Sequence, residues 1–423
     1  MLTLRYNIKF FIKSIRNNSL IESLFLAIPL LLISGPFLPD LSLIIIVIIG
    51  LFKFRRKLFN VIIEQKIIVI IIFFSTYNIL NSFTSEENII SFKSSIAYLR
   101  FPLFAIVASL ILNNNKKLFF QSFLLVKMIL IVLCIDAFFQ FITNFNLLGF
   151  EAIQKNRISG MFGDEYVLGS YLVKIFPLYL FLNYYTNKLS FSITKETLFF
   201  TLIVFLAIFI SGERTSLLLI CTMMFLLFML INNKPFNDYL KYFFYISFIS
   251  VIIITIFSKD LRERYVYLTV GQILSFNIGN LKQDDIKNQN LLHLKVSYKM
   301  FKDKPLNGYG NKMFGHKCFK DYFVDDGRCS THPHNILAQV LVETGLIGFT
   351  LYVLLLFFII MEIISSKKRS KNAHLILLIA ILINFSPTFP SGNFFNNWVN
   401  ILYYLPISFY IALKNDLFIS NHS

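Results

Sequence analysis

The sequence predicts an all-α membrane protein that crosses the bilayer many times. Of its 423 residues, 56% are hydrophobic and only 15% are charged, whereas about a quarter of the residues of a soluble domain are charged. Several apolar runs approach the roughly 20 residues that a helix needs to cross a bilayer. These observations exclude a large soluble core, and we expect a polytopic protein with about twelve transmembrane helices.

Twelve apolar runs supply the expected helices. They lie near residues 21–36, 40–52, 66–84, 96–113, 118–143, 167–185, 197–211, 214–231, 242–258, 335–364, 375–390 and 398–414. A polar insertion separates the ninth run from the tenth. We therefore expect nine membrane helices within residues 1–258, one large loop over residues 259–334, and three membrane helices within residues 335–423.

Basic residues in the short links predict the orientation. They are Arg5, Lys9, Lys13, Arg16, the stretches 53–57, 113–117 and 367–371, and Lys414. When the runs are threaded alternately, all of these fall on one side of the membrane, and by the positive-inside rule that side is the cytoplasm. Both termini are then cytoplasmic, and the 259–334 loop lies outside. Because the lysines and arginines lie mostly in short links between apolar runs, the net charge of +17 does not indicate a nucleic-acid partner.

The four cysteines form two groups. Cys134 and Cys221 lie inside apolar runs, where cysteine is usually an inert packing residue. Cys318 and Cys329 flank a polar stretch of the outer loop at a spacing compatible with a disulfide bond. A zinc site with the nearby histidines is the alternative, but the spacing fits no standard zinc pattern, and we expect no metal.

Two arginines stand beside membrane runs on the expected outer face. Arg157 precedes a run in "NRISGMFGDEYVLGSYL", and a loop arginine that meets lipid headgroups would look the same. Arg214 lies in "SGERTS" between two runs with almost no loop. A charge so close to hydrocarbon is costly unless it reaches water or meets an anion. The planar guanidinium suits a phosphate because it donates two parallel hydrogen bonds.

The stretch "STHPHNILAQVLVETGLIGF" (330–349) re-enters the membrane from the outer loop. His334 and Asn335 stand at this point, with His332 just before them. Histidine titrates near neutral pH and commonly serves as the general base for a hydroxyl. Gly345 and Gly348 follow one helical turn apart. They permit close approach of another helix or of a lipid chain, and helix packing is the simpler explanation.

Four segments together resemble the bacterial O-antigen ligase family and the related O-antigen polymerases. His334-Asn335, followed after nine residues by Gly345-x-x-Gly348, is similar to the family signature. "SGERTSLLL" resembles the family's arginine at a span boundary, and "RISGMFGDEYVLGSYL" resembles its arginine-glycine segment. "MFKDKPLNGYGNKMFGHKC" is similar to the stretch that leads into the outer loop.

The resemblance implies an inverting glycosyltransferase of the C type in the bacterial inner membrane. The donor would be a glycan on undecaprenyl diphosphate, and the acceptor lipid A–core for a ligase or another repeat unit for a polymerase. No cofactor or metal is needed, because the lipid diphosphate is already the leaving group. His334 would be the catalytic base on the periplasmic face, and the substrate would contact Arg214, Arg157, Asn335, His332, Gly345 and Gly348.

One departure from the family leaves the second diphosphate contact open. Family ligases tend to carry an arginine just before the "KDKP" stretch, where this chain has His293, Lys295 and Lys299, and Arg262 and Arg264 lie further upstream.

A transporter or flippase for a lipid-linked sugar is the alternative from another class. It could use the membrane cations Arg100, Lys127 and Lys174, which also read as partners of Asp136 or as interface residues. The better polar candidates lie on one face of the membrane, whereas a flippase should need polar residues along the whole crossing path. This distribution favours the enzyme.

Overall fold

The all-α fold class is confirmed by the structure, a computed structural model. It describes residues 16–154, 156–187, 195–270, 289–319, 329–369, 371–386 and 391–420. Over these ranges the chain is helical, and its strand-like pairing is a single isolated bridge between Phe145 and Glu151. The basic residues Arg5, Lys9 and Lys13 lie outside the described residues.

A helix occupies each of the twelve apolar runs. These helices are α2 (Leu20–Leu31), α3 (Phe37–Glu64), α4 (Lys66–Asn81), α5 (Asn88–Asn114), α6 (Lys117–Thr143), α7 (Leu168–Thr186), α8 (Lys195–Ile210), α9 (Arg214–Leu230), α10 (Lys234–Phe257), α15 (Ile336–Lys368), α16 (Asn372–Asn384) and α17 (Asn397–Ser420). Six of them, α3, α4, α5, α6, α10 and α15, are long and apolar enough to cross a membrane. Helices α2, α8, α9 and α16 are apolar but shorter, so the number of crossings stays a prediction.

Helix α3 is longer than the sequence predicted. We expected the span to end at residue 52 and "KFRRK" to form a link, but the helix continues to Glu64. Lysine and arginine are good helix formers, so a basic stretch does not by itself end a helix. At 1.5 Å per residue α3 is about 42 Å long, which exceeds a hydrocarbon core of about 30 Å. The basic turn can therefore lie beyond the hydrocarbon while remaining helical.

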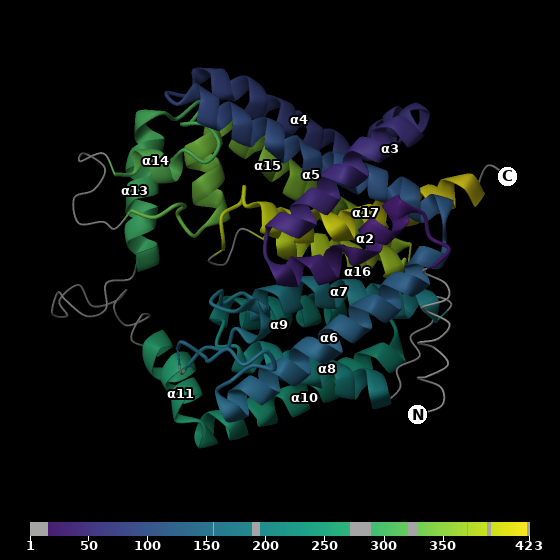
Figure 1. Ribbon diagram of the computed structural model, residues 1–423, viewed down its shortest axis with the longest axis vertical. Coiled ribbons are helices and arrows are strands. Elements are labelled where there is room, and N and C mark those ends of the chain that lie inside the picture. The colour runs from purple at the N-terminus through teal and green to yellow at the C-terminus, as the bar shows by residue number, and fades with distance from the viewer. Residues whose placement is uncertain are drawn as a thin grey trace.

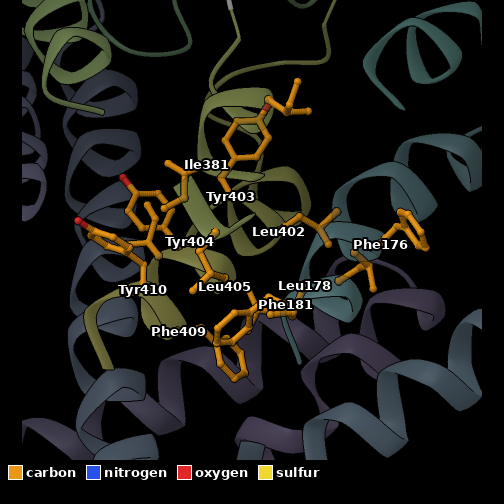
Figure 2. Close-up of a cluster of buried hydrophobic side chains, with 14 of the residues drawn as sticks. Phe176, Leu178, Phe181, Ile381, Leu402, Tyr403, Tyr404, Leu405, Phe409 and Tyr410 are labelled. Atoms are coloured by element: carbon orange, nitrogen blue, oxygen red, sulfur yellow. The ribbon is translucent and has the colours of Figure 1, made fainter. Parts of the chain in front are cut away.

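Helix α16 forms the centre of the bundle (Figure 1). It packs against α15, α7, α17 and α9, and nearly all of its side chains are buried. Figure 2 shows part of this core, where Phe181 of α7 lies beside Phe409 of α17. A tightly packed interior of this kind holds the ends of the helices in fixed relative positions.

The outer faces of the peripheral helices carry exposed apolar side chains. Helix α10 exposes Phe248, Ile252 and Phe257, and α15 exposes Leu354 and Phe357. In a water-soluble protein such contiguous apolar surface would be unusual. Its position on helices of membrane length identifies it as the surface that faces lipid.

The basic short links gather at one end of the bundle. The carboxylate of Glu22 accepts a hydrogen bond from Asn115 (3.1 Å) and interacts with Lys53. Lys414 forms a 2.8 Å ion pair with Glu362, near the end of α15. In Figure 1 this end, where α17 finishes, lies on the right. The side of the membrane that this end faces stays a prediction.

The described part of the 259–334 loop, which we call the outer loop after its predicted side of the membrane, lies at the opposite end, on the left of Figure 1. It contains α11 (Lys259–Arg262), the π-helical turn η4 (Glu263–Tyr267), α13 (Gln289–Asp303) and α14 (Phe314–Lys317). Ion pairs attach it to the acidic turn between α4 and α5: Glu86 lies 2.8 Å from Lys304 and 2.9 Å from Lys317. The loop is therefore docked on the bundle at this point.

Candidate active site

Three histidines form a cluster where the outer loop enters α15. The ring centroids of His332 and His334 are 4.1 Å apart. His293, which α13 carries and which is buried, places its ring 5.3 Å from that of His334. The two histidines predicted from the sequence are thus joined by a third from a distant part of the loop.

The backbone at His334 is held in an uncommon conformation. Its φ of 54° lies in the left-handed region, which non-glycine residues seldom adopt. The carbonyl oxygen of His334 accepts a 2.9 Å hydrogen bond from the Ser391 amide. The next residue, Asn335, caps α15 by accepting a 3.0 Å hydrogen bond from the Ala338 amide. These contacts fix the backbone from which the imidazole projects, and they give Asn335 a structural role.

The histidine cluster favours neutral imidazoles. Burial lowers the pKa of His332 to about 4, with a smaller effect of the same sign from His334. Burial and then the neighbouring His293 lower the pKa of His334 below its ordinary value. A neutral His334 can accept a proton at pH 7, as a general base must.

Gly345 and Gly348 make packing contacts. Gly345 interrupts the helical geometry of α15 with a φ of 63°, and a Cβ there would lie 2.1 Å from the carbonyl oxygen of Leu306. At Gly348 a Cβ would lie 2.2 Å from the hydroxyl oxygen of Thr344 and 3.0 Å from the ring of Tyr77. Both glycines thus permit close packing at these points, which agrees with the expectation of helix packing.

A buried carboxylate of α15 organises the outer segment. Glu343 accepts hydrogen bonds from the amides of Lys312 (3.0 Å) and Phe314 (3.1 Å) and from the side chain of Gln339 (3.3 Å). Gln339 also bonds Asn393 (2.9 Å). Sequence reasoning missed this pair, although a glutamine and a glutamate four residues apart in an apolar helix were a signal.

Arg157 and Arg214 come from different segments and meet at the turn between α8 and α9. Gly212 has a φ of 71°, and a Cβ there would lie 2.4 Å from the Asn156 carbonyl oxygen and 3.2 Å from Cγ of Arg157. Arg214 begins α9 and donates a 3.2 Å hydrogen bond to Thr269. Only glycine lets the loop that carries Arg157 lie this close to the turn that carries Arg214.

A third arginine completes this group. Nε of Arg264, in η4, donates a 2.9 Å hydrogen bond to the carbonyl oxygen of Gly212. Burial, and then the positive charges of Arg214 and Arg157, lower the pKa of Arg264 from its ordinary value. We call Arg157, Arg214 and Arg264 the arginine cluster. The sequence did not predict that Arg264 lies beside Arg157 and Arg214, because it is far from both along the chain.

Glu213 serves the scaffold of the arginine cluster. Its carboxylate accepts hydrogen bonds from the Gly169 amide (2.6 Å), from the Ser170 amide and hydroxyl (3.0 and 2.6 Å), and from Ser216 (3.1 Å). It therefore caps the N-terminus of α7 and anchors the α8–α9 turn there. Within the arginine cluster, Arg157 stacks over the ring of Tyr166 at 4.3 Å, and its buried Nε has no hydrogen-bond partner among the described residues.

The two clusters are linked by the segment 391–398. Ser391 bonds the backbone of His334 (2.9 Å). Trp398 packs edge-on against Phe162 at a centroid distance of 6.3 Å, and Phe162 ends the turn five residues after Arg157. The structure thus brings the predicted residues together in two groups, one of histidines and one of arginines, with a short aromatic segment between them.

Arg100 and Asp136 do not pair with each other. Arg100 forms a bidentate ion pair with Asp40, with hydrogen bonds of 2.9 and 3.1 Å, while Asp136 accepts the Leu147 amide (2.7 Å). Both residues have local structural partners, so neither provides evidence for a transport path.

Cys318 and Cys329 are joined as a disulfide bridge with their Cα atoms 5.7 Å apart, within the usual range. The bridge encloses the polar stretch before the histidine cluster. Among the described residues, no group of three or more His, Cys, Asp or Glu side chains is arranged to hold a metal ion.

Residues 199–353 match the family model described as O-Antigen ligase. The match confirms the family resemblance expected from the sequence, and it runs from α8 to the first half of α15. It includes Arg214, Arg264, His293 and His334, whereas Arg157 lies before it. No curated protein matches the chain.

Proposed function

We propose that this chain, whose residues 199–353 match the O-antigen ligase family, is a membrane glycosyltransferase. It transfers a glycan from undecaprenyl diphosphate to lipid A–core or a similar acceptor, on the periplasmic face of the bacterial inner membrane. The comparison supports a membrane enzyme of the ligase or polymerase type, and the residue contacts support the chemistry that follows.

The arginine cluster is the observation that carries the proposal. Arg157, Arg214 and Arg264 bring three positive charges to one turn, and the adjacent carboxylate of Glu213 can offset at most one of them. Partly buried like charges repel each other strongly. A bound dianion would relieve this repulsion and would accept a hydrogen bond from Nε of Arg157, which has no partner in the described part of the chain. A lipid diphosphate has the required charge and geometry.

The cluster would act most strongly as the glycosidic bond breaks. Negative charge then accumulates on the departing diphosphate, and fixed cations stabilise that charge better in a partly dry site than in water. The N-terminus of α9, which begins at Arg214, adds a favourable partial charge.

His334 would activate the acceptor. As a neutral imidazole it accepts the proton of the acceptor hydroxyl while the oxygen attacks the anomeric carbon. The attacking oxygen and the diphosphate occupy opposite faces of the sugar, so the single displacement inverts the anomeric configuration. The anomeric carbon of the donor sugar would lie between His334 and the arginine cluster, beside the segment 391–398 that links them. The diphosphate is already a good leaving group, so this reaction needs no metal.

The test is transfer in proteoliposomes that contain the lipid-linked glycan and lipid A–core. His334→Ala should keep its folded level and lose transfer by a factor of about 10² to 10⁴. The matched control is His316→Ala, because His316 is exposed on α14. Equal activity of the two variants would contradict the assignment of the base, and a flippase would be little affected by either.

Polymerisation of repeat units is the second candidate, because the same donor chemistry serves it and the family match covers both. Deletion of the gene separates the two. Single repeats on lipid A–core identify the polymerase, whereas long chains that accumulate on the carrier lipid identify the ligase.

A further inference from the structure

The loop between α6 and η3 (Gly160–Phe162) exposes a group of large apolar side chains. They are Phe145, Leu147, Leu148, Phe150 and Ile153. Leu148 is 61% and Ile153 is 66% exposed. Scattered exposed leucines are ordinary on a protein surface, but five large apolar side chains within nine residues form a patch that calls for a covering partner.

Most backbone amides of this loop donate hydrogen bonds within the protein. Eight amides donate to internal acceptors; they belong to Asn144, Phe145, Asn146, Leu147, Leu148, Gly149, Phe150 and Ala152. The buried side chain of Asn146 accepts two of these hydrogen bonds, and the buried carboxylate of Asp136 accepts the bond from Leu147. A loop in water can leave such donors to solvent, whereas a loop in contact with lipid cannot.

The patch continues a surface that already faces lipid. Helix α6 ends at Thr143, and its exposed side includes Ile135, Phe139 and Ile142, the last of which is 77% exposed. The loop therefore extends the lipid-facing side of α6 at the end of the bundle that holds the arginine cluster. Glu151 is the one charged residue in the stretch 144–154, and it lies where the isolated bridge brings the chain back toward Phe145.

We propose that residues 145–153 insert into the outer boundary between lipid headgroups and acyl chains. We call this segment the interfacial loop. Its apolar side chains contact lipid, while several of its backbone amides donate hydrogen bonds to the side chains of Asn146 and Asp136. Because Gln140 and Asn146 both bond the backbone of Gly160, at 2.7 Å each, the interfacial loop and the Arg157 segment are joined. The insertion therefore sets Arg157 at the depth of the headgroup phosphates. This inference concerns the membrane and stands apart from the transfer reaction.

The experiment uses tryptophan fluorescence in vesicles of brominated phosphatidylcholine, with non-brominated vesicles as the reference. Trp398 is the only tryptophan of the chain, so its signal is measured on the unaltered protein and subtracted. The probes are Leu148→Trp and Ile153→Trp. Ile142→Trp on α6 reports full lipid contact, and Tyr298→Trp on α13 is the matched control, because Tyr298 is 59% exposed among lysines of the outer loop.

Bromine quenches only tryptophans that contact the acyl region. We expect both loop probes to be quenched at least half as strongly as Ile142→Trp, and Tyr298→Trp to be nearly unaffected. Loop probes quenched no more than Tyr298→Trp would overturn the inference, and they would do so whether or not the protein transfers glycans. All four positions are exposed, so these substitutions leave the packed core untouched.

Discussion

Arg264 donates a 2.9 Å hydrogen bond to the carbonyl oxygen of Gly212, two residues before Arg214. A residue of the outer loop thereby becomes part of the turn between two membrane helices. Family ligases tend to carry an arginine before the "KDKP" stretch, and this chain does not. Arg264, which lies beside Arg157 and Arg214, is a candidate for the contact that this arginine would make.

Arg264→Ala should reduce transfer by a factor of about 10² to 10³, as expected when one preorganised donor to a developing charge is removed. Arg264→Lys should recover little, because lysine lacks the planar fork and the Nε bond to Gly212. The control is Arg262→Ala, since Arg262 bonds only the nearby Ile256 carbonyl in the hydrogen bonds observed. Transfer rates in proteoliposomes measure the difference, and equal loss in both variants would argue against a specific role.

The pH profile of transfer should reflect the environment of His334. The base must be unprotonated, and burial together with His293 lowers its pKa below 6.5. Activity should therefore persist as the pH falls through 6.5 and decline only at lower pH. His293→Gln removes one neighbouring imidazole, so the acidic limb should move to higher pH, whereas His316→Gln should leave it in place. A limb that stays fixed in His293→Gln would contradict this coupling.

Gly345→Ala should destabilise the protein. An alanine at a left-handed φ costs about 1–2 kcal/mol, and its Cβ would also meet the Leu306 carbonyl at 2.1 Å. Gly392→Ala is the control, because a Cβ there meets its nearest neighbour at 3.9 Å. Thermal unfolding in detergent measures both variants. If Gly345→Ala kept its melting temperature but lost substrate affinity, a binding role for Gly345 would be favoured over packing.

Thiol labelling should reveal a bonded pair among the four cysteines. In a denatured, non-reduced sample only Cys134 and Cys221 should react, and reduction should expose Cys318 and Cys329 as well. The bond should stabilise the loop by about 2–4 kcal/mol, so the double Cys→Ser variant should be more sensitive to protease there. Four reactive thiols before reduction would show that the bond is not formed.

A membrane-impermeant maleimide tests the orientation. In a background without free thiols, Thr331→Cys should be labelled in cells whose outer membrane is permeable, because Thr331 is exposed beside the histidine cluster. Lys368→Cys, exposed at the opposite end of α15, should react only after the inner membrane is opened. The reversed pattern would place His334 in the cytosol and remove the basis of the proposed reaction.

The sequence was sufficient to predict the helical segments, because apolar runs of this length have few alternatives in a bilayer. It also identified His334, Arg157 and Arg214 as candidates, because polar residues stand out at the boundaries of such runs, and their roles stay predictions. It could not predict the end of α3, since a basic stretch is compatible with both a helix and a link.

The sequence could not assign residues to the site where their neighbours depend on tertiary contacts. His293 and Arg264 lie in a polar loop where many lysines and arginines look alike, and only the docking of α13 and η4 separates them from the rest. The glycines illustrate the converse. Their spacing marked them as significant, but only the close backbone of residues 306 and 307 shows what Gly345 contacts.

The burial of α16 has a consequence for biogenesis. At 13 residues it is about 20 Å long, shorter than a bilayer core, and its flanks are covered by α7 and α9 from the first half of the chain and by α15 and α17 from the second. During synthesis α7 and α9 are made long before α16, so their inward faces stay unpacked until α16 is inserted. If synthesis stops before residue 372, the faces of α7 and α9 that α16 covers in the complete protein stay uncovered. Quality-control proteases would then recognise the incomplete chain by this surface.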